Sequence, residues 1–164
     1  MPIASAEFNK GIKMKKILLM TALGLSVAFA GSVAPANNAQ YQKECASCHF
    51  GYQPALLNKA SWEKVMTNLS DHFGTDASLG KVESEQILNY LVTNAGSGKI
   101  TANNNTMQIT NSPYFIKEHR KITPNLIEQK EVGSLANCMA CHTTADKGSY
   151  SERAIVIPNY GSWK

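Results

Sequence analysis

The residues Cys45-Ala46-Ser47-Cys48-His49 form a motif that recurs as Cys138-Met139-Ala140-Cys141-His142, and the two copies use all four cysteines of the chain. A Cys-x-x-Cys-His motif is typical of covalent haem attachment, in which each thiol forms a thioether with a haem vinyl group and the histidine reaches the iron. Residues three and four apart share one face of a helical turn, so a single turn can present the whole motif. The sequence therefore predicts two covalently attached c-type haems, bound through Cys45, Cys48, Cys138 and Cys141 and ligated by His49 and His142.

Paired cysteines also occur in three other kinds of site. A zinc ribbon has pairs about 15 to 20 residues apart, whereas nearly ninety residues separate the two pairs here. A thioredoxin-like redox pair follows an apolar strand, and no such strand precedes either motif. Structural disulfides form in an oxidising compartment, but they give no reason for a histidine after both pairs. Haem attachment is the interpretation that accounts for every residue of the motif.

Residues 14–30 have the pattern of a secretory signal peptide. Met14-Lys15-Lys16 gives a basic start, residues 17–29 are apolar, and Ala28-Phe29-Ala30 is a small-x-small cleavage site. The apolar span is short for a transmembrane helix, and an uncleaved N-terminal anchor is the alternative. We expect residues 1–30, which include 13 upstream residues before Met14, to be removed near Ala30 as the protein is exported to the periplasm.

Net charge gives no support for nucleic-acid or membrane-surface binding. The whole chain has 16 basic and 12 acidic residues, but residues 1–30 contain four of the lysines and only one of the acids, which leaves 12 and 11. Four haem propionates would make the exported protein mildly acidic. The basic character of the full sequence is therefore mainly a property of its leader.

The predicted fold class is mostly α, with two small c-type haem lobes of short helices and irregular loops. Residues 96–111 are rich in Gly, Ser, Thr and Asn, a composition that buries little and indicates a polar linker. We place the N-terminal lobe at 31–98, the linker at 99–111 and the C-terminal lobe at 112–164. Lobes of about 60 residues have marginal hydrophobic cores, so the haem is expected to complete each one.

Helices are predicted around the first motif by apolar periodicity and capping residues. An attachment helix should span residues 40–49. A second helix should be N-capped by Ser61 and end at Gly74, with His72 on its apolar face, and a third should cover about 84–95.

The C-terminal lobe has comparable signals. Ser112-Pro113 predicts a helix start, with proline at the first helical position. Phe115 and His119 then lie four residues apart on one face. A second attachment helix should follow Gly133-Ser134, and residues 155–158 should form a short extended segment.

Two histidines remain outside the motifs as candidate sixth ligands. His72 lies 23 residues after His49, and His119 lies 23 residues before His142. These matched intervals favour His/His ligation, with each lobe supplying both of its own ligands. Methionine is the competing sixth ligand, and Met66 or Met107 could supply it.

Several stretches together resemble the bacterial dihaem cytochrome c family, the small soluble partner of the oxygen-binding monohaem cytochrome of purple bacteria. The resemblance is carried by residues 44–57, Ser61-Trp62-Glu63-Lys64, His72-Phe73-Gly74, Glu118-His119-Arg120 and residues 137–142. It covers nearly all of the chain after the leader, except the stretch around Asn103-Asn104-Asn105. It implies two bis-histidine, low-potential haems that pass electrons between a membrane b-type cytochrome and a small periplasmic haem protein.

We therefore expect a periplasmic electron carrier and not an enzyme. His49, His72, His119 and His142 would fill every axial position of two irons, which leaves no vacancy for a substrate. The alternative is a haem enzyme or a gas-binding or sensor protein in which a distal histidine is displaced.

Overall fold

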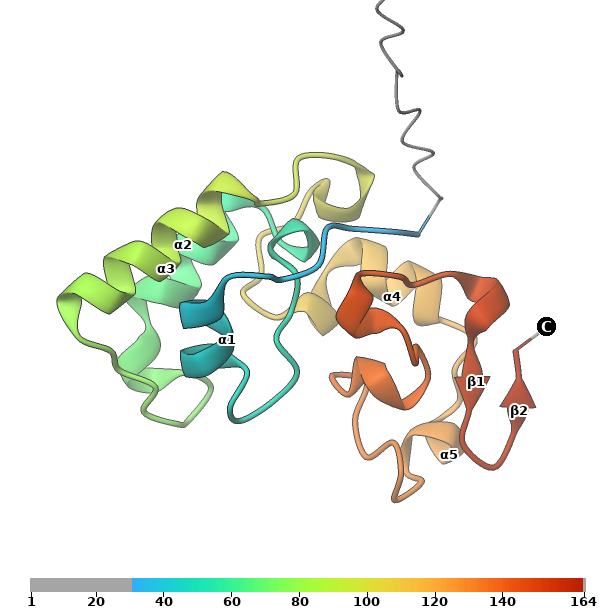
Figure 1. Ribbon diagram of the computed structural model, residues 1–164. Helices are drawn as coiled ribbons and strands as arrows, with labels where there is room; N and C mark the ends of the chain where they lie inside the picture. The colour runs from blue at the N-terminus through green and yellow to red at the C-terminus, as the bar shows by residue number, and fades with distance from the viewer. Residues whose placement is uncertain (1–30, 164) are drawn as a thin grey trace, which may run out of the picture.

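The computed structural model describes residues 31–163, so the predicted signal peptide and its cleavage site lie outside the described residues. Short helices joined by loops make up the fold, which confirms the mostly α class (Figure 1). The helices are α1 (Ala39–Cys45), α2 (Lys59–Thr67), α3 (Lys81–Thr93), α4 (Pro113–His119) and α5 (Pro124–Ile127), and a two-stranded antiparallel sheet is formed by β1 (Val156–Ile157) and β2 (Gly161–Ser162). None of the helices within 31–163 is long and apolar enough to cross a membrane.

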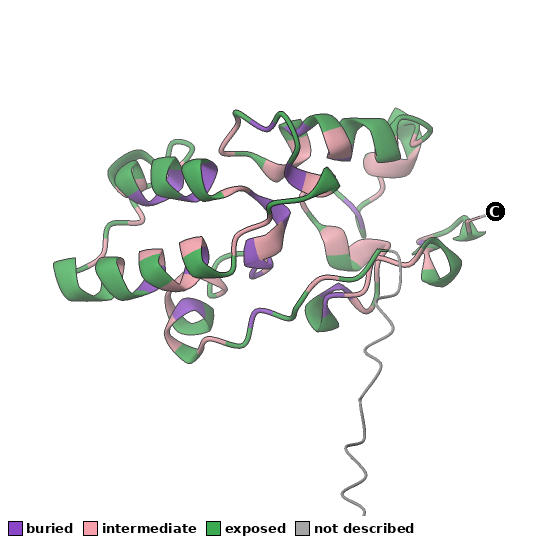
Figure 2. Ribbon diagram, turned by 90° about the horizontal axis from the view of Figure 1, so that it is seen from above, coloured by how far each residue is buried: buried purple, intermediate pink, exposed green. Residues whose placement is uncertain are grey.

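The main hydrophobic core lies where α2 and α3 pack together and α1 meets α3. Ile87 and Leu91, four residues apart on α3, are almost completely buried, whereas the outer faces of both helices are exposed (Figure 2). The other buried members are Ala36, Tyr41, Leu57, Trp62, Val65 and Met66. Trp62 also donates its indole N–H to the carbonyl of Pro54 at 2.7 Å, so this aromatic belongs to the protein core.

The second helix differs from its prediction at both ends. Asn58 is the N-cap of α2, and its side chain accepts the backbone N–H of Ser61 at 2.8 Å, so Ser61 is the third helical residue and not the cap. The helix ends at Thr67, well before Gly74. His72 therefore lies in a turn after the helix and not on its apolar face, and Phe73 there has a φ of 53°.

Both attachment motifs are built on less helix than predicted. The first helix ends at Cys45, and residues 46–48 form turns. In place of a second attachment helix there is only a 3-10 turn, Cys138–Ala140. By contrast, Ser112 caps α4 as predicted, with Pro113 at the first position, and β1 lies within the predicted extended segment.

The polar segment 99–111 is packed against its neighbours. It contains two 3-10 turns, Lys99–Thr101 and Ile109–Asn111, that contact α4. Thr101 and Asn104 are buried, and the side chain of Asn58 donates to the carbonyl of Asn104 at 2.8 Å. The predicted lobe boundaries stay a prediction, but this segment buries more than its composition indicated.

The start of the described chain pairs with a segment near its end. The N–H of Val33 donates to the carbonyl of Gly148, and the N–H of Tyr150 donates to Gly31, each at 2.8 Å. Gly148 has a φ of +76°, and a Cβ at this position would overlap the carbonyl oxygen of Val33. Glycine is required there both by its backbone conformation and by the close approach.

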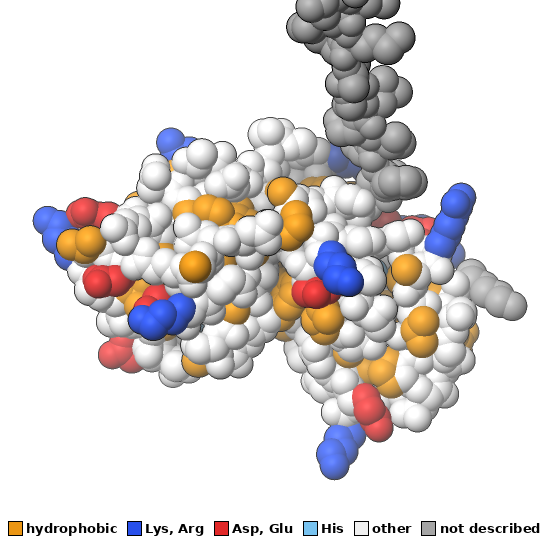
Figure 3. Space-filling view, in the orientation of Figure 1, with side chains coloured by type: hydrophobic (Ala, Val, Ile, Leu, Met, Phe, Trp, Pro, Cys, Tyr) orange, Lys and Arg blue, Asp and Glu red, His pale blue; other side chains and the backbone are white. Residues whose placement is uncertain are grey.

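Charged side chains are scattered over the surface. On the face shown in Figure 3, basic and acidic side chains are interspersed and form no single-sign patch. Three exposed ion pairs, Lys43–Glu44, Lys59–Glu63 and Lys81–Glu85, occur among the described residues, and pairs of this kind contribute little stability.

Candidate functional site

The four histidines lie in two close pairs. The ring centroids of His49 and His72 are 6.3 Å apart, and their planes are inclined by 18°. The ring centroids of His119 and His142 are 6.1 Å apart, with planes inclined by 72°. The structure therefore brings together the same pairs that the intervals in the sequence predicted.

This spacing suits two imidazoles that share one metal ion. An imidazole nitrogen binds a metal at about 2 Å, so rings on opposite sides of one ion have centroids about 6 Å apart once the ring radii are added. Within residues 31–163 no group of three or more His, Cys, Asp or Glu side chains could hold a metal ion. A macrocycle with four in-plane nitrogens would complete the coordination, and a haem fits this requirement.

Backbone carbonyls orient one histidine of each pair. Nδ1 of His49 lies 2.8 Å from the carbonyl oxygen of Phe50, and Nδ1 of His119 lies 2.9 Å from that of Phe115. A carbonyl only accepts, so in each case Nδ1 carries the proton and donates it. The lone pair of Nε2 is then free for a metal, as in many metal-bound histidines.

Burial favours the neutral, metal-binding form of three of the histidines. It lowers the pKa of His142 to about 4, with a further contribution from the neighbouring His119. Burial also lowers the pKa values of His119 and of His72. Because metals bind the deprotonated imidazole, these rings are ready for coordination at neutral pH.

No disulfide closes either motif, because none of the four cysteines is bonded to another. Burial raises the pKa of Cys45 to about 11 and that of Cys138 to about 11. A redox-active Cys-x-x-Cys pair depends on a thiol whose pKa is lowered. The environments of Cys45 and Cys138 therefore do not suit thioredoxin-like chemistry.

The two methionines that could serve as sixth ligands lie in or against the main hydrophobic core. Met66 is buried in the main core on α2, and Met107 packs against that core from the polar segment. Each motif histidine instead faces another histidine.

Each histidine also has an aromatic neighbour. The rings of Phe115 and His119 stack at 3.8 Å, and Phe73 meets His72 edge-on at 4.7 Å. Tyr52 lies 5.3 Å from His49, and Tyr150 lies 5.4 Å from His142. The sequence places Phe115 and His119 on one helical face, but no pattern points to Tyr150.

Two consecutive residues after the first motif bond to the segment around the second motif. The hydroxyl of Tyr52 donates to the carbonyl of Ala136 at 2.9 Å. Gln53, which is completely buried, donates to the carbonyl of Ala145 at 2.6 Å, and its own side-chain oxygen accepts the hydroxyl of Tyr150. These contacts hold the two histidine pairs in a fixed relation.

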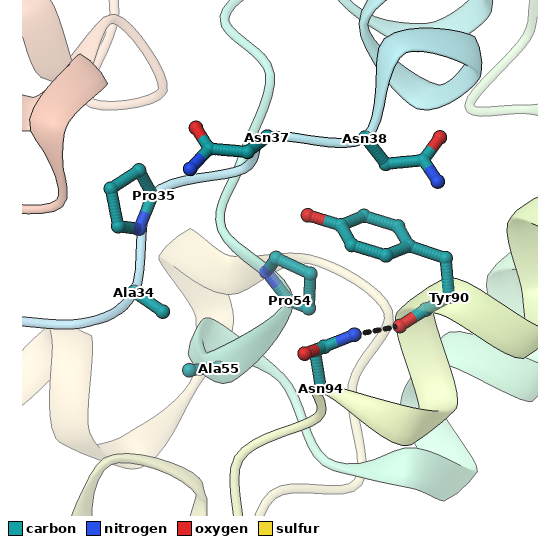
Figure 4. Close-up of a pocket in the computed structure, with 8 residues that line it drawn as sticks. All are labelled: Ala34, Pro35, Asn37, Asn38, Pro54, Ala55, Tyr90 and Asn94. Carbon is teal, nitrogen blue, oxygen red and sulfur yellow. Dashed lines mark hydrogen bonds between the residues drawn. The ribbon is translucent and has the colours of Figure 1, made fainter.

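A cavity elsewhere in the molecule has a different character. It has a volume of about 360 Å³ and lies between residues 34–38 and the end of α3, where Asn94 donates to the carbonyl of Tyr90 (Figure 4). Its lining contains no cysteine or histidine. The cavity therefore lies apart from the histidine pairs.

Comparison with known proteins gives a consistent result. A model of the family described as dihaem cytochrome c matches residues 41–150. The diheme cytochrome c of Shewanella baltica OS155 is 35% identical, with a TM-score of 0.69 over 77% of this chain and 98% of its own. A diheme cytochrome c from Rhodobacter sphaeroides is 34% identical, with a TM-score of 0.66 over 72% of this chain and 100% of its own. No curated protein matched. The chain therefore belongs to the dihaem cytochrome c family, and it is a c-type cytochrome with two haems.

Proposed function

We propose that this cytochrome is an exported electron carrier with two bis-histidine haems. Cys45 and Cys48 would hold the first haem, with His49 and His72 as its axial ligands. Cys138 and Cys141 would hold the second, with His142 and His119. The observation that carries this proposal is the near-equal spacing of the two histidine pairs, 6.3 and 6.1 Å, each beside a Cys-x-x-Cys motif.

A bound haem supplies a one-electron redox centre, and the chain determines how that centre can be used. Two imidazoles on each iron would leave no axial position for a small molecule. The carbonyls of Phe50 and Phe115 hold His49 and His119 through Nδ1, which would leave Nε2 of each ring available to the haem iron. Histidine as sixth ligand gives a lower potential than methionine. These features suit electron transfer more than substrate turnover.

The redox partners follow from the family resemblance. We propose that the protein takes electrons from a membrane b-type cytochrome and delivers them to a small periplasmic haem protein. The pattern of residues 14–30 supports export, since c-type haems and their partners would then share one compartment.

Optical spectra of the oxidised and reduced protein, with and without carbon monoxide, test the function. We expect low-spin spectra in both states and no shift on adding carbon monoxide to the reduced protein at neutral pH. Rapid stoichiometric binding of carbon monoxide by either haem would instead favour a gas-binding or enzymatic role with a displaced histidine.

Intact mass of the denatured, acid-extracted protein tests the attachment. We expect a chain without residues 1–30 that carries two haems. The Cys45→Ala/Cys48→Ala variant should keep one haem, and so should the matched Cys138→Ala/Cys141→Ala variant. A wild-type mass with one haem or with free thiols would contradict the assignment.

A further inference from the structure

The two histidine pairs share a spacing but differ in the relative twist of their rings. The planes of His49 and His72 are close to parallel, at 18°, whereas those of His119 and His142 are close to perpendicular, at 72°. The difference between the two sites therefore lies in ring orientation and not in distance.

The orientation of His119 is fixed on two sides. Its Nδ1 bonds to the carbonyl of Phe115 one helical turn earlier, at 2.9 Å. The ring of Phe115 stacks on it at 3.8 Å with an angle of only 12° between the planes. Phe115 is itself buried, and its backbone N–H bonds to the capping hydroxyl of Ser112 at 3.3 Å. Rotation of the His119 ring would break the hydrogen bond and the stacking together.

The ring of His142 is oriented by a different neighbour. Tyr150 meets it at 64° and 5.4 Å, and Tyr150 is held by its hydrogen bond to the buried Gln53. Nδ1 of His142 is buried and has no hydrogen-bond partner among the described residues. Its orientation therefore comes from packing. In the first site, by contrast, the ring beside His72 is the exposed Phe73, which meets it edge-on.

We propose that the C-terminal haem is held between crossed imidazoles and the N-terminal haem between parallel ones, and that Phe115 is the positioning residue that sets the crossed arrangement. This inference rests on the proposed bis-histidine ligation. The π system of each axial imidazole interacts with one of two iron d orbitals that are otherwise equal in energy. Parallel rings act on the same orbital and separate the two energies, whereas crossed rings act on both and keep the energies close. The two haems are therefore electronically inequivalent.

Electron paramagnetic resonance of the frozen, oxidised protein tests the inference without measuring electron transfer. We expect two low-spin signals: one rhombic, with three resolved g values, and one strongly anisotropic, with a single large g value. The His72→Ala variant should remove the rhombic signal and leave the anisotropic one, which assigns each signal to its haem. Two identical rhombic signals in the wild type would overturn the inference and leave bis-histidine ligation intact. A high-spin signal in the wild type would overturn the ligation, and with it both proposals.

Substitutions at Phe115 test its role. Phe115→Leu keeps the backbone carbonyl that bonds to His119 but removes the stacked ring, so the anisotropic signal should move toward the rhombic form while the other stays unchanged. Phe115→Tyr keeps the stack and should restore the wild-type spectrum. Phe73→Leu removes the aromatic neighbour of His72 and should leave the anisotropic signal unchanged. An unchanged anisotropic signal in a Phe115→Leu protein that keeps both haems would contradict the role of Phe115, and the wild-type spectrum tests the crossed geometry even if that variant does not fold.

Discussion

The hydroxyl of Tyr52 donates a 2.9 Å hydrogen bond to the carbonyl of Ala136, two residues before Cys138. The ring of Tyr52 also lies 5.3 Å from that of His49. Tyr52 therefore lies beside the histidine of the first motif and hydrogen-bonds to a residue just before the second motif. Together with the buried Gln53 beside it, Tyr52 links the segments that carry the two motifs.

Replacement of Gln53 by leucine should destabilise the protein. The carbonyl of Ala145 and the hydroxyl of Tyr150 would both lose a buried partner, and each unsatisfied group costs about 1–3 kcal/mol. Urea unfolding measures the loss. The exposed Gln86 on α3 provides the control, since Gln86→Leu should change the free energy of unfolding by less than about 0.5 kcal/mol. Equal unfolding midpoints for the two variants would contradict the role of Gln53.

Removal of either distal histidine should affect one haem only. His72→Ala should convert the N-terminal haem from low-spin to high-spin and leave the other unchanged, because His72 faces His49. His119→Ala should do the same to the C-terminal haem. Optical spectra of both variants, compared with the wild type, make the measurement. An effect of His72→Ala on the C-terminal haem would mean that the lobes exchange ligands, and a sulfur-to-iron band in the wild type would point to Met66 or Met107.

Stability should fall in alkaline solution because of Tyr41. Burial raises the pKa of this hydroxyl above its usual value of 10.0, so above pH 10 the unfolded chain releases a proton that the folded protein keeps. The free energy of unfolding must then decrease as the pH rises.

Urea unfolding between pH 8 and pH 11 measures this slope. The Tyr41→Phe variant loses the 2.7 Å hydrogen bond to the carbonyl of Tyr52, which should lower stability at neutral pH by about 1 kcal/mol. Its alkaline slope should nevertheless be shallower than that of the wild type. Parallel slopes for the two proteins would exclude Tyr41 as a source of the pH dependence.

A pair of glycine substitutions separates backbone strain from close approach. Gly148→Ala places a methyl group against the carbonyl of Val33, whereas Gly133→Ala, at a φ of +68°, meets nothing within 4 Å. Both variants should lose about 1–3 kcal/mol of stability, because alanine is strained in the left-handed backbone conformation. Gly148→Ala should lose more, because the pairing of residues 31–33 must also shift. Thermal unfolding of the two variants gives the comparison, and equal losses would show that the close approach adds nothing.

Sequence reasoning succeeded where the signal is local. The start of α4 follows from Ser112 and Pro113, which act within one helical turn. The pairing of His49 with His72 is predicted by the matched intervals and by a helical face for His72. The two rings lie 6.3 Å apart, although His72 lies outside the helix on which it was placed.

The end of α2 shows why that placement was wrong. Asn68 donates to the carbonyl of Asp71 at 2.7 Å, and the carboxylate of Asp71 accepts the N–H of Gly74 at 3.0 Å. Short polar side chains compete with the helix for backbone groups in this way. An apolar period that continues through such residues therefore does not predict that the helix continues. His72 lies in the turn that these polar residues form.

Contacts between distant segments left no trace in the sequence. The hydroxyl of Tyr52 donates to a carbonyl 84 residues away, and the side-chain amide of Gln53 donates to a carbonyl 92 residues away. A carbonyl has no residue identity, so no pattern could indicate it. The attachment motifs can be recognised because their cysteines and histidine lie close together in the sequence.

The pairing of residues 31–33 with 148–150 has a kinetic consequence. Its two halves come from opposite ends of the described chain, so the pairing can form only after almost all of the described polypeptide is present. Contacts of such long sequence separation form slowly, because the loop entropy is lost before the contact is gained. The cysteines and histidines of both motifs lie inside this loop. Both motifs are therefore enclosed by a contact that is expected to form late in folding.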